Sequence, residues 1–349
     1  MTKQLSPQLT ASAGSQPPSR GSMRGIQVSV VLTTRNRAGL LAEALRAFAV
    51  QNVEDPNNVE IVVVDNASTD NTKKVVDEIS ATSPISVSYV YEATPGYQFA
   101  LNRGVTESRG EWIAFCDDDQ LPHPDMLETL RAAAIKNRAD CVGGTTRLRL
   151  EGDAPHWLGP VCRGILGEHV FKGAPARCDG KVIPAGGNMM VARRVFDAIG
   201  MFDTALSAGN DMDILLRARA AGFSIWAVPA AETRHLVPEY RLSREYLRWV
   251  SLRWGSQFAE IHWKTTGGPR TLGFCLARSG LSVLVRIPML AIAYLRARTA
   301  DVLDLECLLW RAWAYARKCL YLISPATFPQ SGFFDFLDFR TQRDFAHRL

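Results

Sequence analysis

Apolar runs of strand length alternate with segments of helical spacing over residues 26–138 of this 349-residue chain. The run Val59–Asp65 is apolar at nearly every position, which is typical of a strand covered by helices on both faces of its sheet. This alternation predicts an α/β fold with a doubly wound, mostly parallel sheet flanked by helices. The predicted strands are 26–34, 59–65, 87–91 and 112–116, and the predicted helices are 38–50, 71–80, 97–107 and 124–138.

Polar residues follow the predicted strands at the edge where such sheets bind ligands, beyond the carboxyl ends of the strands. Thr34, Asp65 and the triplet Asp117–Asp119 all lie there. Three adjacent carboxylates repel one another unless a cation holds them. Asp117 and Asp119 point to one face of an extended chain, and Mg²⁺ or Mn²⁺ takes such oxygen ligands while leaving positions for a diphosphate. The alternative is a solvated acidic turn.

The second half of the chain is less regular. Residues 150–184 are rich in Gly and Pro, which predicts an irregular excursion over the site. A helix is expected over residues 211–221, and a strand over residues 223–228 leads toward His235. From Ser243 onward the pattern is helical and aromatic, so we expect a C-terminal helical extension.

The net charge of +5 is concentrated near the C-terminus. From Arg241 onward the chain has sixteen Lys and Arg but only eight Asp and Glu. A basic region beside an acidic site favours an anionic membrane surface or an anionic substrate, and the net charge is too small to indicate nucleic acid. The C-terminal helices either lie on a membrane or pack on the sheet. Ser279–Leu295 contains Arg286 and Pro288 and falls short of a membrane span.

The cysteines and the N-terminus indicate a cytoplasmic protein. The seven Cys residues form no C-x-x-C pair and are odd in number, which is typical of reduced thiols. Residues 1–25 lack the apolar segment of a signal peptide, and we expect them to form a disordered leader.

Four motifs in order resemble those of the family 2 glycosyltransferases, which are inverting enzymes of the GT-A fold. Val28–Asn36 resembles the opening nucleotide-binding strand and turn, and Val64–Asp70 resembles the V-D-[DN]-x-S-x-D segment. Asp117–Asp119 matches the D-x-D metal motif. Asn210–Asp213, followed by His235, resembles the acceptor half, with Asn210 where the family usually has Glu. The resemblance covers roughly residues 26 to 255.

The resemblance implies a role for each of these side chains. Asp211 is the expected general base, with Asp213 as a rival, although a first-turn Asp also suits a helix N-terminus. The metal, Mn²⁺ or Mg²⁺, is expected on Asp117, Asp119 and His235. Nucleotide-sugar binding is expected from Thr33, Thr34, Arg35, Asn36, Asp65, Asp117 and Asp118. The alternative for Asp65 is a turn residue that caps the following helix, but its place at a strand end favours the binding role.

Further candidates have an alternative each. Gly186 and Gly187 allow close approach of the backbone to the sugar or form a flexible turn. Arg241 and Arg244 are candidates for contact with the diphosphate or are solvated helix charges. Trp157 stacks on a sugar ring or packs in a loop.

The implied function is metal-dependent, inverting transfer of a sugar from a nucleoside-diphosphate sugar to a saccharide or lipid-linked saccharide acceptor. The expected setting is bacterial cell-surface polysaccharide or glycolipid biosynthesis, in the cytoplasm or at the inner face of the plasma membrane. The expected domains are a catalytic GT-A domain over 26–240, with halves 26–120 and 121–240, and a basic, aromatic helical region over 241–349. The alternatives are a catalytically silent scaffold and a sugar nucleotidyltransferase, but the turn Thr33–Asn36 lacks the glycines of a nucleotidyltransferase loop.

Overall fold

The computed structural model describes residues 25–150, 153–180, 183–206 and 209–329. The expected leader, apart from residue 25, and the last twenty residues of the expected helical region lie outside these ranges. The strands are β1 (Val28–Thr34), β2 (Val59–Asp65), β3 (Ser86–Tyr91), β4 (Trp112–Asp117), β5 (Gln120–Pro122), β6 (Cys141–Leu150), β7 (Ala176–Arg177), β8 (Met189–Ala192) and β9 (Ile225–Val237). The helices of the sheet region are α1 (Ala38–Ala49), α2 (Thr72–Ser80), α3 (Tyr97–Glu107), α4 (Met126–Asn137), α5 (Pro160–Ile165), α6 (Arg193–Ile199) and α7 (Asn210–Ala220).

The described strands form one mixed sheet in the order β3-β2-β1-β4-β8-β6-β9-β5, with β7 added beside β9. β1 to β4 are parallel. β8 runs antiparallel between β4 and β6, and β5 runs antiparallel to β9. The predicted α/β class with flanking helices is therefore confirmed, while the half beyond β4 contributes the antiparallel strands.

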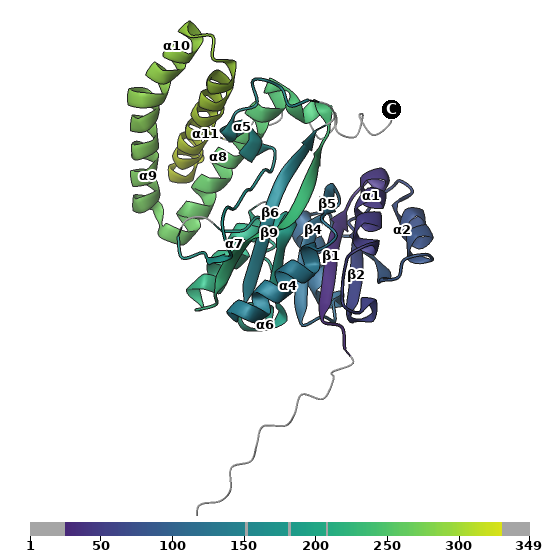
Figure 1. Ribbon diagram of the computed structural model, residues 1–349. Helices are drawn as coiled ribbons and strands as arrows, with labels where there is room; N and C mark the ends of the chain where they lie inside the picture. Colours follow the sequence, from purple (N-terminus) through teal and green to yellow (C-terminus); the bar gives the residue numbers. More distant parts are fainter. Residues whose placement is uncertain (1–24, 151–152, 181–182, 207–208, 330–349) are drawn as a thin grey trace, which may run out of the picture.

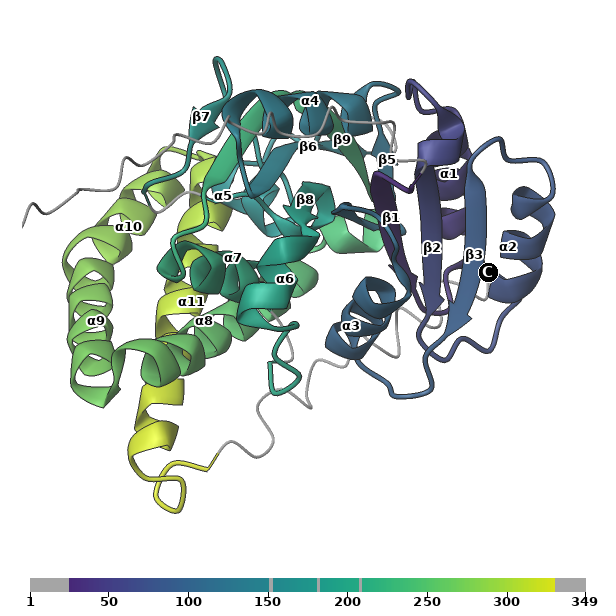
Figure 2. The same cartoon turned by 90° about the horizontal axis from the view of Figure 1, so that it is seen from below.

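Helices cover both faces of the first half of the sheet. Every residue of β1 and β2 is buried, as the apolar sequence of Val59–Asp65 predicted. Figure 2 shows α1 and α2 on one side of these strands and α3 on the other. This arrangement follows from the right-handed connections of parallel strands, because the chain moves outward from β1 to β3 and then returns to β4.

The chain reverses direction between β1 and β4, and sheets of this kind bind ligands in the crevice outside the carboxyl ends of the strands at such a point. The sheet register brings the predicted polar residues together there. Thr33 lies opposite Asp117, and Thr34 lies opposite Asp65.

The second half contains two long strands that differ from the expectation. β6 was not predicted, and β9 does not stop at residue 228 but runs to Val237 beside it. Pro229 explains the error, because proline usually ends a strand or marks a bulge. Here the register shifts between Gly144 and Thr145, and residues 229–231 bulge past it. A side chain on Gly144 would collide with the carbonyl oxygen of Ala231, so the bulge requires glycine there. The excursion expected over 150–184 also contains α5 and β7.

The C-terminal helices form a separate layer at the end of the long strands (Figure 1). They are α8 (Arg244–Thr266), α9 (Gly268–Leu281), α10 (Ile287–Leu295) and α11 (Thr299–Ile323). α8 and α11 pack on α5 and on the end of β9 through an apolar cluster that includes Leu247, Leu303 and Leu166. A π-helical turn at Ser282–Arg286 joins α9 to α10 without a break.

The continuity of α9 and α10 corrects the rejection of a membrane-spanning length. Gly268–Leu295 is one helical run of 28 residues that is long and apolar enough to cross a membrane, and it is the one such helix in the described residues. Arg286 and Pro288 do not interrupt it, because the π turn accommodates the proline at the start of α10.

Candidate active site

The acidic triplet at the end of β4 is held by cations and hydroxyl groups from other elements. Asp118 accepts hydrogen bonds from Thr34 Oγ1 and Arg37 Nη1, both at 2.7 Å. Asp119 Oδ2 lies 3.2 Å from Arg37 Nη1 and 3.1 Å from Arg241 Nη2. Asp118 and Asp119 are buried, so the alternative of a solvated acidic turn is excluded for these two residues.

Positive charge is distributed unevenly over the triplet. Burial would raise the pKa of Asp119, but His235, Arg37 and Arg241 hold that pKa well below its usual range. Burial and the neighbouring Asp119 and Asp118 outweigh the charge of His235 and raise the pKa of Asp117 to about 6. Its hydrogen-bond partners are neutral: Tyr97 Oη donates at 3.1 Å and Gln120 Nε2 at 3.4 Å. Among the described residues, the Asp117 carboxylate therefore has no ion-pair partner in direct contact.

The ring of His235 is oriented by the backbone. Its Nδ1 lies 2.8 Å from the carbonyl oxygen of Leu166. Because a carbonyl only accepts, Nδ1 carries a proton, and Nε2 is the ring nitrogen that faces the triplet. Nε2 lies 3.3 Å from Asp119 Oδ1 and 3.1 Å from Arg241 Nη1. In metal-binding histidines, the ring nitrogen that does not hold the metal commonly donates a hydrogen bond that orients the ring. The bond from Nδ1 to the Leu166 carbonyl is of this kind.

The turn Gly186–Gly187 lies between the triplet and the expected base. The N–H of Gly186 donates to Asp211 Oδ2 at 2.8 Å. A Cβ on Gly187 would lie 2.7 Å from Asp117 Oδ2 and closer still to Gln120 Nε2. The two glycines thus let one backbone turn touch both carboxylates, and a flexible-turn interpretation is not needed.

The contacts of α7 separate the two rival bases. Asp213 forms an ion pair with Arg217 one helical turn later, at 2.8 Å. Asp211 has no salt-bridge partner among the described residues, and its carboxylate faces the glycine turn. The geometry favours Asp211 as the group that is available to a substrate.

The nucleotide half of the predicted site is a network of turns. Asp65 is buried and accepts hydrogen bonds from the N–H of Ser68 and from Tyr89 Oη, both at 2.8 Å. Asn36 accepts from the N–H of Thr69 at 2.7 Å and so joins the turn after β1 to the turn after β2. The turn interpretation of Asp65 therefore applies to Oδ1, which accepts from Ser68, whereas Oδ2 accepts from Tyr89.

Several residues of the site were not identified from the sequence. Arg37 and Tyr97 contact the triplet, and Gln120 lies against Asp117. The nearest sequence signal was the Thr33–Asn36 turn, which led to Arg35, but Arg35 is exposed. Thr33 is buried beside Asp117. Within the described residues, the buried side-chain atoms that lack a hydrogen-bond partner include Arg37 Nε, His169 Nε2, Asn188 Oδ1 and Asn210 Oδ1.

Two of the unassigned candidates lie outside the site. Trp157 packs in the apolar cluster between α5 and the C-terminal helices. Arg244 pairs with Glu306 on α11.

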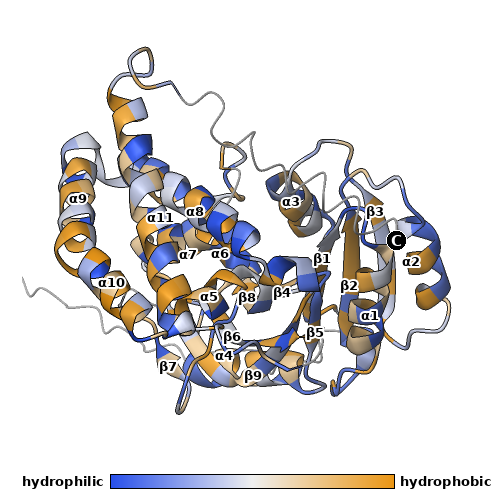
Figure 3. Cartoon of the chain, turned by 90° about the horizontal axis from the view of Figure 1, so that it is seen from above, coloured by the Kyte–Doolittle hydropathy of each residue, from blue (hydrophilic) through white to orange (hydrophobic). Residues whose placement is uncertain are grey.

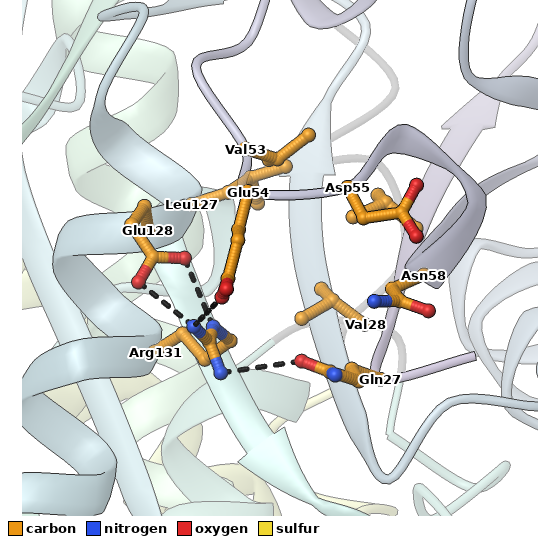
Figure 4. Close-up of a pocket in the computed structure, with 10 residues that line it drawn as sticks. Gln27, Val28, Val53, Glu54, Asp55, Asn58, Leu127, Glu128 and Arg131 are labelled. Carbon is orange, nitrogen blue, oxygen red and sulfur yellow. Dashed lines mark hydrogen bonds and ion pairs between the residues drawn. The ribbon is translucent and has the colours of Figure 1, made fainter. Parts of the chain in front are cut away.

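A small cavity of about 20 Å³ lies at the opposite end of the strands, between α4 and the amino ends of β1 and β2. Arg131 donates hydrogen bonds to Glu128 and Gln27 there (Figure 4). The cavity is too small for a nucleotide.

The side chains around the triplet offer ligands for a divalent metal. Across the ranges that the structure describes, no three His, Cys, Asp or Glu side chains are gathered in a metal-binding arrangement. Asp119 Oδ1 and His235 Nε2 nevertheless lie 3.3 Å apart, and the direct hydrogen-bond partners of Asp117 are neutral. These three residues fit a hard cation chemically, provided that Arg241 gives way.

Comparison with known proteins agrees with this geometry. Residues 29–200 match the family "Glycosyl transferase family 2". The succinoglycan biosynthesis protein ExoM of Rhizobium meliloti is 27% identical over 61% of this chain and 67% of its own length. The glycosyltransferase AglE of Haloferax volcanii is 28% identical over 57% of this chain and 63% of its own length, so the match leaves about a third of each relative uncovered.

The fold has a solved counterpart in a mannosyltransferase, PcManGT from Pyrobaculum calidifontis, in complex with GDP-Man and Mn²⁺. The two chains superpose with a TM-score of 0.57 at 19% identity, over 83% of this chain and 86% of the other. At this identity the similarity concerns the fold alone. The family match, the relatives and the fold agree: residues 29–200 form a family 2 glycosyltransferase domain, and the chain has the GT-A fold.

Proposed function

We propose that this protein transfers one sugar from a nucleoside-diphosphate sugar to an acceptor hydroxyl, with inversion at the anomeric carbon. The observation that carries the proposal is the Gly186–Gly187 turn, which touches Asp117 of the acidic motif on one side and Asp211 on the other. A donor bound at the triplet therefore has a carboxylate across the turn. Single displacement needs one base and no nucleophilic carboxylate.

The donor lies in the crevice beyond β1, β2 and β4. Asp65 and the Thr33–Asn36 turn bind the nucleoside, because they border the crevice at adjacent strand ends. Asp118 lies deeper and is fixed by Thr34 and Arg37. The mannosyltransferase neighbour holds GDP-Man, which supports a nucleotide-sugar donor here.

A divalent ion, Mn²⁺ or Mg²⁺, is held by Asp119 and His235 with Asp117 beside them. When bound, it acts as a Lewis acid that stabilises the charge of a departing diphosphate. The protein prepares this place by the Leu166 carbonyl, which orients the His235 ring, and by Asp117, whose direct hydrogen-bond partners are neutral. The Mn²⁺ in the mannosyltransferase neighbour supports the choice of ion.

Asp211 takes the proton from the acceptor hydroxyl at its free carboxylate oxygen. The N–H of Gly186 holds the other oxygen, so the carboxylate keeps one orientation. The acceptor is a saccharide, a proposal supported by the relative named for succinoglycan biosynthesis. A cell-surface polysaccharide or glycolipid is the corresponding product class.

The proposal is tested by calorimetric titration of the protein with UDP, GDP, dTDP and CMP, each with and without Mn²⁺. We expect one of the diphosphates to bind, with Mn²⁺ strengthening its binding. Failure of all four nucleotides to bind under both conditions would favour the silent scaffold instead.

We further propose that the arm formed by α9, the π turn and α10 rests on an anionic membrane. Its outer side chains are exposed and apolar, with Leu276 74%, Leu284 77% and Leu295 88% exposed, and Figure 3 shows the arm largely in the hydrophobic colour. Arg286 lies within this arm and Arg296 follows it directly. Exposed apolar surface flanked by basic residues suits an anionic bilayer surface.

A groove beside the arm suits a lipid-linked acceptor. It has a volume of about 420 Å³ between α10 and α11, and its lining includes apolar Met289, Ile292 and Leu305 as well as Arg296 and Arg298. Flotation with vesicles of phosphatidylcholine, with and without phosphatidylglycerol, tests membrane contact. The wild type should float with the anionic vesicles, Leu284→Glu should not, and Val50→Glu, an exposed apolar position on the distant α1 end, should behave as the wild type. Equal flotation of all three proteins would contradict the membrane contact.

A further inference from the structure

The guanidinium of Arg241 occupies the point toward which Asp119 and His235 are directed. Arg241 Nη2 lies 3.1 Å from Asp119 Oδ2, and Nη1 lies 3.1 Å from His235 Nε2. The side chain is only 11% exposed. It comes from a short 3-10 turn, Glu239–Leu242, that joins β9 to α8.

Asp119 and His235 need a positive group at this point. Nε2 lies 3.3 Å from the carboxylate Oδ1, and both atoms are electron-pair donors when the ring carries its proton on Nδ1 alone. Two lone pairs at that distance repel each other unless a proton, a guanidinium or a metal ion offsets them. Arg241 contacts both groups at once, His235 at Nε2 and Asp119 at its other oxygen, Oδ2.

A metal ion and Arg241 cannot occupy the same point. The second arginine of the site differs in this respect, because the hydrogen bonds of Arg37 in the triplet go to Asp118 and Asp119 and not to His235. Arg37 can stay in place when a metal enters, whereas Arg241 has to leave its two partners. Its release is costly unless a new anion receives the guanidinium, and arginine suits the oxygens of a diphosphate.

We propose that Arg241 is an internal counter-cation, which fills the metal position in the nucleotide-free protein and moves to the diphosphate when metal and donor bind together. This inference rests on the proposed metal-dependent function. Metal and nucleotide then bind with positive coupling, because each removes part of the cost of displacing Arg241. The protein discriminates against a bare ion and responds to the metal–nucleotide pair.

The test measures free Mn²⁺ by electron paramagnetic resonance during titration of the protein, with and without UDP or GDP. The wild type should bind bare Mn²⁺ weakly, and the nucleotide should tighten that binding. Arg241→Met keeps the volume of the stem and removes the charge, so it should bind bare Mn²⁺ about tenfold to a hundredfold more tightly than the wild type. Arg241→Lys keeps the charge and should resemble the wild type.

Arg244→Met is the matched control, because Arg244 pairs with Glu306 away from the triplet, and its Mn²⁺ binding should be unchanged. Arg241→Gln is also neutral and carries the same prediction if Arg241→Met does not fold by circular dichroism. Failure of the wild type to bind Mn²⁺ with either nucleotide would overturn the proposed metal site itself. Nucleotide-dependent binding in the wild type, with no gain for bare Mn²⁺ in the neutral variants, would overturn the role of Arg241 alone.

Discussion

Gly187 is the position where one added methyl group would disturb the site most directly. In Gly187→Ala the new Cβ would lie 2.7 Å from Asp117 Oδ2, whereas ordinary van der Waals contact begins at 3.4 Å. The carboxylate would have to retreat by about 0.7 Å, the difference between these two distances. The amide of Gln120 would have to move further, and it is buried against Thr233.

The size of the effect follows from this crowding. Overpacking of a buried site costs about 1 to 3 kcal/mol of stability. Displacement of a functional group by about 1 Å reduces activity by up to about 100-fold, so we expect Mn²⁺-dependent nucleotide affinity to fall at least about tenfold, or about 1.4 kcal/mol.

Calorimetry with the selected diphosphate and a thermal melt measure the two effects. Gly273→Ala is the matched control, since a Cβ there meets nothing within 4 Å, and it lies within α9. Its nucleotide affinity should be unchanged. If Gly187→Ala bound nucleotide and melted as the wild type does, the close approach of this turn to Asp117 would be refuted.

Two further predictions concern charges in the sheet region. Burial alone would raise the pKa of Glu60, but hydrogen bonds from Ser29 and Arg109 bring it below 4.5, so its stabilising effect is present above pH 4.5 and is lost as the pH falls below it. The melting temperature of the wild type should therefore fall more steeply below pH 4.5 than that of Glu60→Gln, and parallel curves would contradict this. Arg37→Met leaves Asp118 and Asp119 without their shared cation and should cost about 3 to 5 kcal/mol in urea unfolding; an unchanged midpoint would show that the ion pairs are not stabilising.

The first half of the fold was predictable because its signals are local. Continuous apolar strands and helices of period 3.6 placed β4 at 112–116 against an observed Trp112–Asp117. Parallel sheets bind ligands at the carboxyl ends of their strands. This rule predicted that Thr34, Asp65 and the triplet lie at one edge, although no contacts were known.

The second half depends on contacts between distant residues. β9 passes Pro229 only because Gly144 on the neighbouring strand leaves room for the bulge. The local sequence around Pro229 does not indicate that Gly144 lies beside it, and the sequence around Gly144 does not indicate the bulge. The exposure of the α9–α10 arm is likewise a property of packing, since the same apolar sequence would suit a buried helix.

The candidate site likewise contains residues that local sequence predicts and residues that only tertiary contacts bring to it. Residues at strand ends were found from the pattern, whereas Asp211 and His235 came from the resemblance to a family. The arginines on the triplet come from positions that are more than eighty residues away from it (Arg37) or more than a hundred (Arg241), and only tertiary structure brings them there. Arg241 was noted as a candidate for phosphate contact, but its position between Asp119 and His235 required the structure.

The central claim is that Asp211 is the catalytic base of a sugar transfer. It is tested most directly by turnover of Asp211→Asn beside Asp213→Asn, with the donor sugar of whichever diphosphate binds. The amide can still accept the hydrogen bond from Gly186, so nucleotide affinity should stay within about twofold while kcat falls by about 10² to 10⁴. Asp213→Asn loses only the ion pair to Arg217 and should keep nearly normal turnover. Normal turnover in Asp211→Asn, or loss of turnover in Asp213→Asn alone, would contradict the assignment.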